Sequence, residues 1–458
     1  MINNTIAAIS TGMTNSGIGK IRLSGSQAID IVDKVFKNPT GKQILSEAES
    51  HTIHYGFIYD EERLIDEVLV LVMKAPRSYT TEDIVEIDCH GGVVVMKKIL
   101  ETVIKYGACP AEPGEFTKRA FLNGRIDLSQ AEAVIDVIQS KNEYALDSSI
   151  KQLKGNILNR ITHIRKRIIS DVAFIEAALD DPEHISMEGF SEKLLARVNE
   201  SMDDLFELLS TSENGRMIKE GIKTVIVGKP NAGKSSLLNV LVGDERAIVT
   251  EIAGTTRDTL EENINIHGIS LNIVDTAGIR DTDDIVEKIG VNKARVIAKD
   301  ADLVIYVVDG STMLDQNDEQ IFDIIKDKKS IILLNKVDLA LKTTKEMIAL
   351  RTDSPIVEIS AKKESGIDKF EKVLKDMFFN GKLTFNDEIY ITNIRHKAAM
   401  SEALESLKMV VQSVDDGMPE DFFSIDLMNA YEILGSIIGE SVSEDLVETI
   451  FSDFCMGK

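Results

Sequence analysis

The chain has 458 residues, of which 43% are hydrophobic and 28% are charged, and its formal net charge is −24. This length supports about two to four domains, each with a core of its own. A protein that grips nucleic acid by its overall charge carries a basic surface, so this acidic chain is excluded from that class and needs a local patch or a basic partner for such work.

The first 122 residues alternate between strand-like and helix-like segments. Alternating apolar positions mark the strands, and apolar positions at helical spacing mark the helices. We expect residues 1–122 to form an α+β domain. The predicted strands are residues 5–10, 19–23, 53–59, 67–73 and 84–88, and the predicted helices are residues 27–36 and 93–106.

From residue 128 to about residue 212 the apolar spacing is helical, so residues 123–216 are predicted to form the first part of a helical domain. Ser129, with Glu132 three residues later, predicts a capping box at its start. The helices break near Asp181 and Pro182. A basic cluster on this stretch is either a local nucleic-acid patch or, more commonly, a solvated helix face. It consists of Arg160, Arg165, Lys166 and Arg167.

Between residues 217 and 380 strands alternate with helices, which is typical of a doubly wound α/β domain. Helical sequence then returns at residues 393–414 and from residue 424 onward, so residues 381–458 form a second helical part. We therefore expect one discontinuous all-α domain with an α/β P-loop G domain inserted into it. The predicted strands are residues 223–227, 271–275, 303–309, 331–335 and 356–360.

Residues 228–235 match the phosphate-loop pattern Gly-x-x-x-x-Gly-Lys-Ser, between a predicted strand and a predicted helix. The glycines let backbone N–H groups wrap the phosphates, Lys234 adds a positive charge and the Ser235 hydroxyl binds Mg²⁺. The helix N-terminus adds the positive end of its dipole. The predicted nucleotide contacts here are Asn231, Ala232, Gly233, Lys234, Ser235 and Ser236.

Two further motifs suit the γ-phosphate. Thr256 is predicted to close over it and to bind Mg²⁺, while Asp275 holds the same ion through water and the amide of Gly278 senses the phosphate. GTP would order both segments, and hydrolysis would release them. The predicted contacts are Thr250, Glu251, Ile252, Ala253, Gly254, Thr255, Thr256, Asp275, Thr276, Ala277 and Gly278.

The last two motifs select guanine. Asp338 is a paired acceptor for the N1–H and N2 groups that guanine has and adenine lacks, and the Ala361 amide is placed to donate to guanine O6. Asn335 is expected to tie this loop to the phosphate loop. The predicted contacts are Asn335, Lys336, Val337, Asp338, Ser360, Ala361 and Lys362. Because all the motifs occur in the order that a G domain requires, they predict GTP rather than a generic nucleotide.

The residue after the second phosphate motif is Ile279, where small regulatory G proteins have a glutamine that orients the attacking water. An apolar side chain does not orient water, so catalysis needs another group. The following acidic segment offers four carboxylates, which the residues alone do not rank: Asp281, Asp283, Asp284 and Glu287. The amide oxygen of Asn231 is a candidate ligand for a monovalent cation near the β- and γ-phosphates.

Cys89, Cys109 and Cys455 are widely separated and make neither a disulfide framework nor a zinc site, which fits a reducing compartment. The longest apolar run, residues 68–73, is far too short to span a bilayer. A signal or transit peptide is not apparent. We expect a cytoplasmic protein without a membrane partner.

The motifs together resemble one family, the tRNA modification GTPase family MnmE, also called TrmE, over the whole chain. Beyond the G-domain motifs, the likeness rests on residues 120–125 (Ala-Phe-Leu-Asn-Gly-Arg) and on residues 454–458 (Phe-Cys-Met-Gly-Lys). The family ends in Phe-Cys-Ile-Gly-Lys, so Met456 is an apolar exchange within the motif.

The resemblance implies an N-terminal folate-binding-like domain that also forms a homodimer and holds 5-formyltetrahydrofolate as one-carbon donor. The matching positions are Arg22, Glu82, Arg125 and Lys458. Some members have lysine at position 125, so the charge is kept while the geometry differs. Cys455, in the terminal motif, is either an inert apolar residue or part of the one-carbon site.

The resemblance also implies a heterotetramer with an FAD-dependent MnmG-type partner, with FAD only in that partner and tRNA bound mainly through it. Together they would add a carboxymethylaminomethyl or aminomethyl group to C5 of the wobble uridine. For hydrolysis, the family pattern selects Glu287 to orient the water. It also implies a K⁺ ion that lets two G domains dimerise, with the ligands Asn231, Thr250, Ile252 and Thr255.

Two alternatives remain at this point. A ribosome-assembly GTPase of the same superfamily would carry a basic RNA-binding domain after the G domain, and the helical sequence there is not strongly basic. A pure nucleotide switch that docks a partner would fit Ile279, whereas potassium-stimulated hydrolysis would exclude it.

Overall fold

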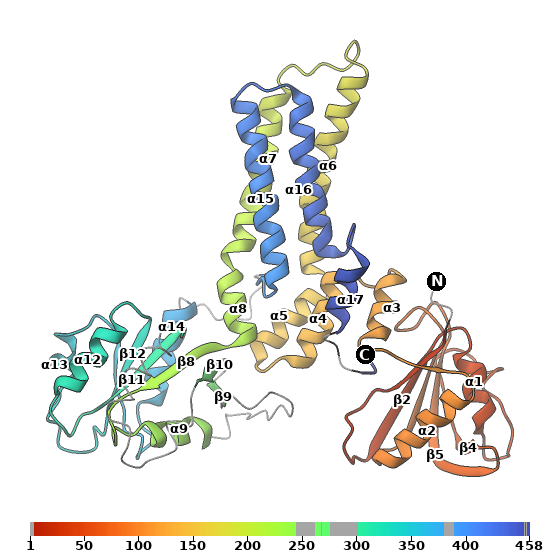
Figure 1. The fold of residues 1–458 in the computed structure, drawn as a ribbon, viewed down its shortest axis with the longest axis horizontal. Coiled ribbons are helices and arrows are strands. Elements are labelled where there is room, and N and C mark those ends of the chain that lie inside the picture. Colours follow the sequence, from red (N-terminus) through yellow and green to blue (C-terminus); the bar gives the residue numbers. More distant parts are fainter. Residues whose placement is uncertain are drawn as a thin grey trace. The chain divides into compact units, whose positions relative to one another are not determined.

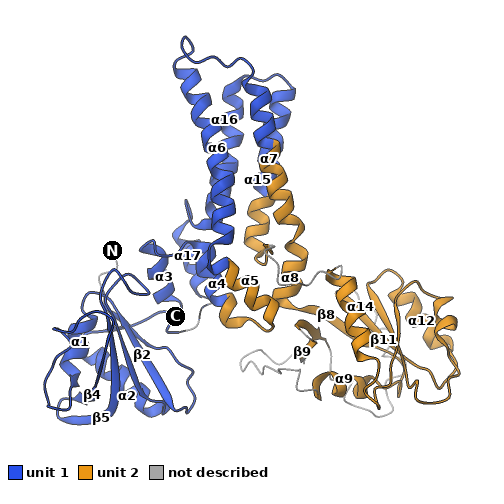
Figure 2. Ribbon diagram, turned by 180° about the vertical axis from the view of Figure 1, so that it is seen from behind, with its two compact units in different colours: residues 1–135, 152–198, 402–458 blue, residues 136–151, 199–401 orange. Residues whose placement is uncertain are grey.

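The computed structural model (Figure 1) describes residues 4–243, 262–266, 268–274, 301–379, 389–452, 454 and 456–458. These residues form two compact units, drawn in two colours in Figure 2. Unit 1 contains residues 1–135, 152–198 and 402–458, and unit 2 contains residues 136–151 and 199–401. Among the described helices, none is both long and apolar enough to cross a membrane.

The N-terminal part of unit 1 is an α+β domain, as predicted. Its described strands form a seven-stranded sheet in the order β3-β4-β5-β6-β2-β1-β7, antiparallel except for the parallel pair β1–β7. Helices α1 (Ala28–Val35) and α2 (Val93–Lys105) contact the sheet and bury its apolar face. The strands are β1 (Ile6–Ile9), β2 (Ile18–Ser24), β3 (Phe36–Lys37), β4 (Thr52–Asp60), β5 (Arg63–Met73), β6 (Ile84–His90) and β7 (Cys109–Pro110).

All seven predicted elements of this domain are present. The sequence did not predict β3 and β7, because a two-residue strand is too short to show an alternating pattern. Both lie at the edges of the sheet, where only a neighbouring strand defines them.

The helical residues come from both sides of the G domain, which confirms a discontinuous all-α domain. Within unit 1, α6 and α16 pack along each other, although the whole G domain separates them in sequence. The helices are α3 (Glu115–Leu122), α4 (Leu128–Gln139), α5 (Glu143–Leu153), α6 (Asn156–Asp180), α7 (Phe190–Ser210), α8 (Ser212–Glu220), α15 (Ile394–Asp415), α16 (Glu420–Ile438) and α17 (Glu444–Ser452). The residue boundaries of the four predicted segments stay a prediction.

The expected break after α6 is present, with Asp181 as the C-terminal cap. The predicted capping box of α4 is wrong by two residues. Asp127 is the cap: its Oδ1 accepts hydrogen bonds from the backbone N–H groups of Ser129 and Gln130, and Gln130 Oε1 accepts from the N–H of Asp127. The reciprocal pair is therefore Asp127 and Gln130, because an aspartate two residues earlier caps the helix first.

In the basic cluster, Arg165 is buried and serves the helical packing. Its Nε donates to the carbonyl oxygen of Tyr431 at 3.1 Å, its Nη2 lies 2.7 Å from Glu440 Oε2, and its guanidinium covers the Tyr431 ring at 3.9 Å. Because Arg165 lies inside the α6–α16 packing, it does not contribute to a nucleic-acid surface.

The G domain lies in unit 2 and has the predicted α/β architecture. Its described strands form a six-stranded sheet in the order β13-β12-β11-β8-β10-β9, parallel except for the antiparallel pair β9–β10. The strands are β8 (Ile222–Val227), β9 (Glu262–Ile266), β10 (Ile269–Ile273), β11 (Leu303–Asp309), β12 (Ser330–Asn335) and β13 (Ile356–Glu358). The helices are α9 (Lys234–Gly243), α12 (Gln316–Ile325), α13 (Lys345–Ala349) and α14 (Ile367–Phe379).

The five predicted strands of this sheet are found within a few residues of their expected positions. Strand β13 ends at Glu358 rather than at residue 360, and Ser360 instead forms an isolated bridge with Ser365. Strand β9 was not predicted from the sequence. Its alternation of asparagine and isoleucine was a usable signal, because Ile264 and Ile266 are both buried.

Candidate functional site

The phosphate loop connects β8 to α9, as its sequence predicts. Gly228 has a φ of 154°, Asn231 a φ of 58° and Gly233 a φ of 98°, so three residues of the loop have a positive φ. A Cβ atom on Gly233 would lie 2.2 Å from Asn335 Nδ2, so only glycine allows the two loops to approach this closely.

Lys234 spans this loop from the first turn of α9. Its Nζ donates to the carbonyl oxygens of Gly228 and Lys229, both at 2.8 Å. Burial lowers the pKa of this ammonium from its usual value. A phosphate group would oppose that shift, because an opposite charge nearby favours the charged form of lysine. Ser235 is half-buried and Ser236 is exposed on the same turn.

Asn335, the last residue of β12, joins three of the predicted motifs. Its Nδ2 donates to the carbonyl oxygen of Ala232 at 2.9 Å, and its Oδ1 accepts from the N–H of Ala361 at 3.0 Å. Only 2% of Asn335 is exposed, so both ends of its amide are used in the interior. This arrangement confirms that Asn335 ties the guanine loop to the phosphate loop.

Lys336 makes a second tie between the same loops. Its Nζ donates to the carbonyl oxygen of Asn231 at 2.7 Å and to Asp309 Oδ2 at 2.6 Å. Asp309, at the end of β11, was not predicted. Burial raises the pKa of its carboxyl, but the hydrogen bonds from Lys336 and Ser311 outweigh burial and the pKa lies below its usual value.

Asp338 is prepared as a hydrogen-bond acceptor. Its Oδ1 accepts from the Ser360 hydroxyl at 2.7 Å. This hydrogen bond, helped by the charges of Lys362 and Lys363, lowers the pKa of Asp338, so the carboxylate stays ionised at neutral pH. An ionised carboxylate only accepts, which suits the two donors on the guanine edge.

The structure thus brings together the described members of the predicted GTP site: Asn231, Ala232, Gly233, Lys234, Ser235, Ser236, Asn335, Lys336, Val337, Asp338, Ser360, Ala361 and Lys362. The remaining predicted residues lie outside the described part of the chain: Thr250, Glu251, Ile252, Ala253, Gly254, Thr255, Thr256, Asp275, Thr276, Ala277, Gly278 and Glu287. Their assignments stay predictions.

The donors that are described fit Mg²⁺ held mainly by a hydroxyl, phosphate oxygens and water. In the described part of the chain, no three His, Cys, Asp or Glu side chains gather as a metal site. Magnesium at phosphates takes few protein ligands, so the half-buried Ser235 at the start of α9 is a sufficient protein contribution from this side.

Two of the predicted folate residues, Arg22 and Arg125, lie in unit 1 beside Tyr79, a residue that the sequence did not single out. The guanidinium of Arg125 lies 4.4 Å from the centre of the Tyr79 ring, and that of Arg22 lies 5.6 Å from it. Arg22 also donates to the carbonyl oxygen of Gly457 at 3.3 Å, so the end of the chain contacts the same guanidinium group. The C-terminal backbone is fixed further by the N–H of Phe116, which donates to the carbonyl oxygen of Lys458.

Glu82 is engaged beside this site. Its Oε2 accepts from Arg119 Nη1 at 3.0 Å and from the Ser24 hydroxyl at 2.7 Å. Arg119 is only 2% exposed and also pairs with Glu115 at 2.8 Å, so it joins two carboxylates in the interior. Cys455 lies outside the described residues.

Arg22 is oriented by Glu86, at a distance of 2.8 Å between Arg22 Nε and Glu86 Oε1. Burial raises the pKa of Glu86, but Lys20 and Arg22 outweigh burial, so its pKa lies below the usual value. A fixed carboxylate therefore directs one cation of this site. No sequence motif indicated Glu86, because only the pairing of β2 with β6 places it opposite Arg22.

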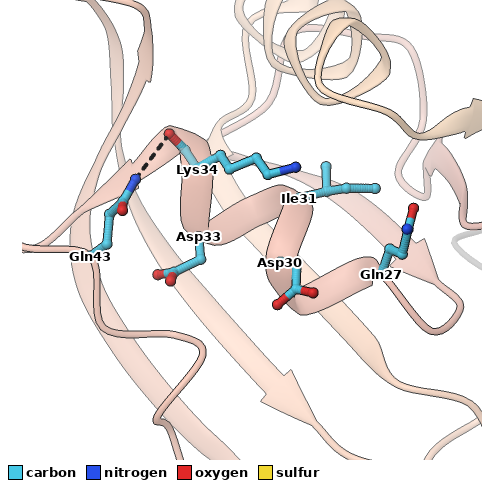
Figure 3. A pocket seen from close by; sticks show the side chains of 6 residues that line it. All are labelled: Gln27, Asp30, Ile31, Asp33, Lys34 and Gln43. Atoms are coloured by element: carbon cyan, nitrogen blue, oxygen red, sulfur yellow. Dashed lines mark hydrogen bonds between the residues drawn. The ribbon is translucent and has the colours of Figure 1, made fainter.

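A surface pocket at α1 belongs to neither site (Figure 3). Two of its polar groups serve the fold: Asp33 Oδ1 accepts from the N–H of Leu45 at 2.8 Å, and Gln43 Nε2 donates to the carbonyl oxygen of Lys34 at 3.4 Å. The remaining lining residues are Gln27, Asp30 and Ile31. The pocket thus stays without an assigned role.

Two family models match this chain. The model described as "MnmE helical domain" matches residues 128–455, and the one described as "GTP-binding protein TrmE N-terminus" matches residues 5–125. The first includes the helices after the G domain, where the ribosome-assembly alternative predicted a basic RNA-binding domain.

Full-length relatives are also found. The chain is 63% identical to a tRNA modification GTPase MnmE of Lachnoclostridium phytofermentans over 458 residues, covering 100% of both chains. It is 46% identical to one of Geobacillus thermodenitrificans, covering 99% of both. Among solved structures, Era of Aquifex aeolicus bound to GDP and AlF4⁻ is 29% identical, with 41% of this chain and 67% of that chain covered and a TM-score of 0.26.

Proposed function

The chain belongs to the MnmE family of tRNA modification GTPases, also called TrmE, and from this premise we propose that it is a potassium-activated GTP hydrolase that modifies tRNA. With an FAD-dependent MnmG-type partner, it adds a carboxymethylaminomethyl or aminomethyl group to C5 of the wobble uridine of certain tRNAs in the cytoplasm. The observation that carries the GTPase is Asn335, which holds the phosphate loop and the guanine loop in one hydrogen-bonded unit.

For hydrolysis, we assign Glu287 to orient the attacking water and Asn231, Thr250, Ile252 and Thr255 to hold K⁺. Of these, only Asn231 is described. Its carbonyl oxygen is held by Lys336 while the residue itself is exposed, which supports a role for its side chain toward a cation at the phosphates. When bound, K⁺ would supply positive charge where negative charge develops on the phosphates. Mg²⁺ would be held by Ser235 and Thr256.

In the N-terminal domain, we assign Arg22, Glu82, Arg125 and Lys458 to 5-formyltetrahydrofolate. An aromatic ring flanked by two guanidinium groups supports a ligand that is itself flat and anionic, as a folate is. When bound, the folate would supply the one-carbon unit. Cys455 is the candidate residue for the one-carbon site, and the oxidation chemistry belongs to FAD in the partner.

We further propose that the chain is a homodimer that joins two MnmG-type chains in a heterotetramer. The N-terminal sheet supports self-association, because Ile53, Tyr55 and Leu69 are 64%, 48% and 45% exposed. Tyr55 pairs directly with Leu69 across β4 and β5, and Ile53 lies two residues from Tyr55, so the three side chains share one face. A second copy of this chain is the occupant that we assign to this face.

The test is mass spectrometry of tRNA nucleosides from cells that lack this protein, complemented with the normal chain or with a Lys234→Met variant. We expect C5-unmodified wobble uridine in the deletion and with the variant, and the modified nucleoside with the normal chain. Unchanged wobble uridines in the deletion would contradict the proposed function.

A further inference from the structure

Lys229, the second residue of the phosphate loop, has its side chain bound by two carboxylates. Its Nζ lies 2.9 Å from Asp315 Oδ2 and 2.7 Å from Asp318 Oδ2, and its side chain is 17% exposed. Both aspartates stand at the N-terminus of α12, which follows β11. The charge of Lys229 is therefore used within the protein, and Lys234 is the cation of the loop that we assign to the nucleotide.

Asp318 is the centre of this arrangement. It is 1% exposed, and its two oxygens accept three hydrogen bonds: from Lys229 Nζ, from the backbone N–H of Asp315 at 2.8 Å and from the hydroxyl of Tyr306 at 2.6 Å. Tyr306 is fully buried in β11. Burial and the neighbouring Asp318 raise the pKa of Tyr306, so its hydroxyl remains a donor.

Asp315 completes the group. Its Oδ1 caps α12 by accepting from the backbone N–H groups of Asn317 and Asp318, while its Oδ2 accepts from Lys229. The hydrogen bond from Lys229 is the largest cause of the lowered pKa of Asp315. Lys229 thus binds both members of the capping box of α12 at once.

Two hydrogen bonds connect the phosphate loop to the guanine loop. Asn335 donates to the carbonyl oxygen of Ala232, and Lys336 donates to the carbonyl oxygen of Asn231. The Lys229 side chain provides a separate tie, to α12. The backbone carbonyl of Lys229 is also one of the two oxygens that hold the ammonium of Lys234. Fixing the Lys229 side chain therefore fixes a peptide group that orients Lys234.

We propose that Lys229 is a positioning residue for nucleotide binding, acting through Asp315 and Asp318 to pre-organise the phosphate loop and Lys234. A loop that is already ordered loses less conformational entropy when it binds phosphate, so the tie raises affinity without touching the ligand. The inference rests on the GTP site and not on the tRNA reaction. The β-phosphate is common to GDP and GTP, so both affinities depend on Lys229.

The test uses the full chain with Lys229→Met, which keeps an unbranched side chain and removes the charge. We expect the Kd for GDP and the KM for GTP to rise about tenfold while kcat stays within about twofold, because the loop contacts are the same in the ground and transition states. Lys229→Arg keeps a cation that binds two carboxylates, and we expect its affinities within about threefold of the normal chain.

Arg351→Met is the matched control. Arg351 forms an ion pair of 2.6 Å with Glu319 of α12, the helix that Lys229 also contacts, and the change removes this pair. We expect the nucleotide affinity of this variant to be unchanged. If Lys229→Met leaves the GDP affinity unchanged, or lowers kcat without changing GDP affinity, the proposal is wrong. Weaker GDP binding in Arg351→Met, equal to that in Lys229→Met, would also overturn it.

Lys229→Met leaves Asp318 charged and buried without its cation, which can prevent folding. The double variant Lys229→Met with Asp318→Asn removes both charges. The amide oxygen can accept from the N–H of Asp315 and the amide nitrogen can donate to the Tyr306 oxygen, so no charge is left buried without a partner. We expect it to regain the melting temperature while GDP affinity stays lowered. Full recovery of GDP affinity would mean that Lys229 only compensates a buried charge.

The GDP measurement needs no tRNA, potassium or partner protein. The GDP measurement therefore tests the role of Lys229 even if the proposed tRNA modification is wrong. Conversely, an unchanged GDP affinity would contradict the role of Lys229 without contradicting the tRNA modification.

Discussion

Around the phosphate loop, the side chains of Asn335 and Lys336 hold the loop by its backbone carbonyls, and both belong to the motif that also selects guanine. Around Tyr79, by contrast, the partners are single residues without a shared motif: Arg22 from β2 and Arg125 from the segment that follows α3. Arg22 in turn contacts the end of the chain. The residues of the first site belong to short motifs that can be recognised in the sequence. The second exists only where separate segments of the fold meet.

The difference has an energetic side. In the G domain, Lys234 is held by neutral backbone carbonyls, while the N-terminal site places Arg119 between Glu82 and Glu115 with almost no exposure. Buried charges are costly when one partner is removed, so the N-terminal site is tied to the stability of its domain. The comparison predicts loss of function without unfolding when Lys234 is changed, and unfolding when Arg119 is changed.

The largest effect is expected for Lys234→Met in the G domain. The change removes the ammonium that lies over the loop, and we expect GTP turnover to fall by about 1000-fold, the scale of losing a main electrostatic contact. Turnover and the melting temperature are measured together. Within the described part of the chain, the hydrogen bonds of Lys234 go to two loop carbonyls, so a large drop in melting temperature would contradict the comparison.

Arg119→Met tests the opposite expectation in the N-terminal domain. Two carboxylates would lose their buried cation, and we expect the free energy of unfolding to fall by about 3 kcal/mol in urea denaturation. Lys98→Met is the control, since its 3.6 Å pair with Glu101 is exposed and worth at most about 1 kcal/mol. Equal losses in the two variants would show that Arg119 is not a special case.

Glu287→Ala should lower kcat by about 100-fold, because it removes the group assigned to orient water, and should leave the affinity for GTP unchanged. Turnover is measured in potassium and in sodium salts. Unchanged turnover in potassium would remove Glu287 from the mechanism, and equal rates in both salts would remove K⁺.

Tyr79→Leu keeps an apolar side chain and removes the ring that both guanidinium groups contact. We expect binding of 5-formyltetrahydrofolate, followed by calorimetry, to weaken by about tenfold, the scale of a lost cation–π and stacking contact. GTP turnover serves as the internal control and should not change. Unaltered folate binding would show that the ring is only part of the core.

The smallest effect is a pH dependence at Glu86. Its folded pKa is lowered, so its contribution to stability is complete above the unfolded value of about 4.3 and is lost as pH falls through the folded pKa. Glu86→Gln should therefore cost stability at pH 7, and the difference from the normal chain should shrink as pH falls below about 4. A difference that grows on acidification would contradict the lowered pKa.

Much of the fold was predictable from local patterns. Long strands such as β11 were found at their observed bounds because a run of buried apolar residues has few other structures available to it. Short edge strands were missed, and the cap of α4 was misplaced because Asp127 and Ser129 are both good caps and only the observed hydrogen bonds choose between them.

In the GTP site, the motif residues were predictable because each phosphate or base contact demands a particular residue type at a fixed spacing. Lys229 was not, since its partner Asp318 is 89 residues away and looks like an ordinary helix-cap residue. Tyr79 was also missed, because the sequence around an isolated aromatic residue does not show whether its ring contacts a ligand or belongs to the core.

By itself the sequence determined the order of domains, the nucleotide and its base, because spacing along the chain is enough to define a phosphate loop and a guanine loop. Only the tertiary structure decided which charges act on those loops and which hold the fold. Lys229 and Lys234 are neighbours in one motif, yet one ammonium is bound by two aspartates and the other by the loop itself. The interaction energy of two charges depends on their separation in space and on their burial, and neither quantity can be obtained from the order of residues alone.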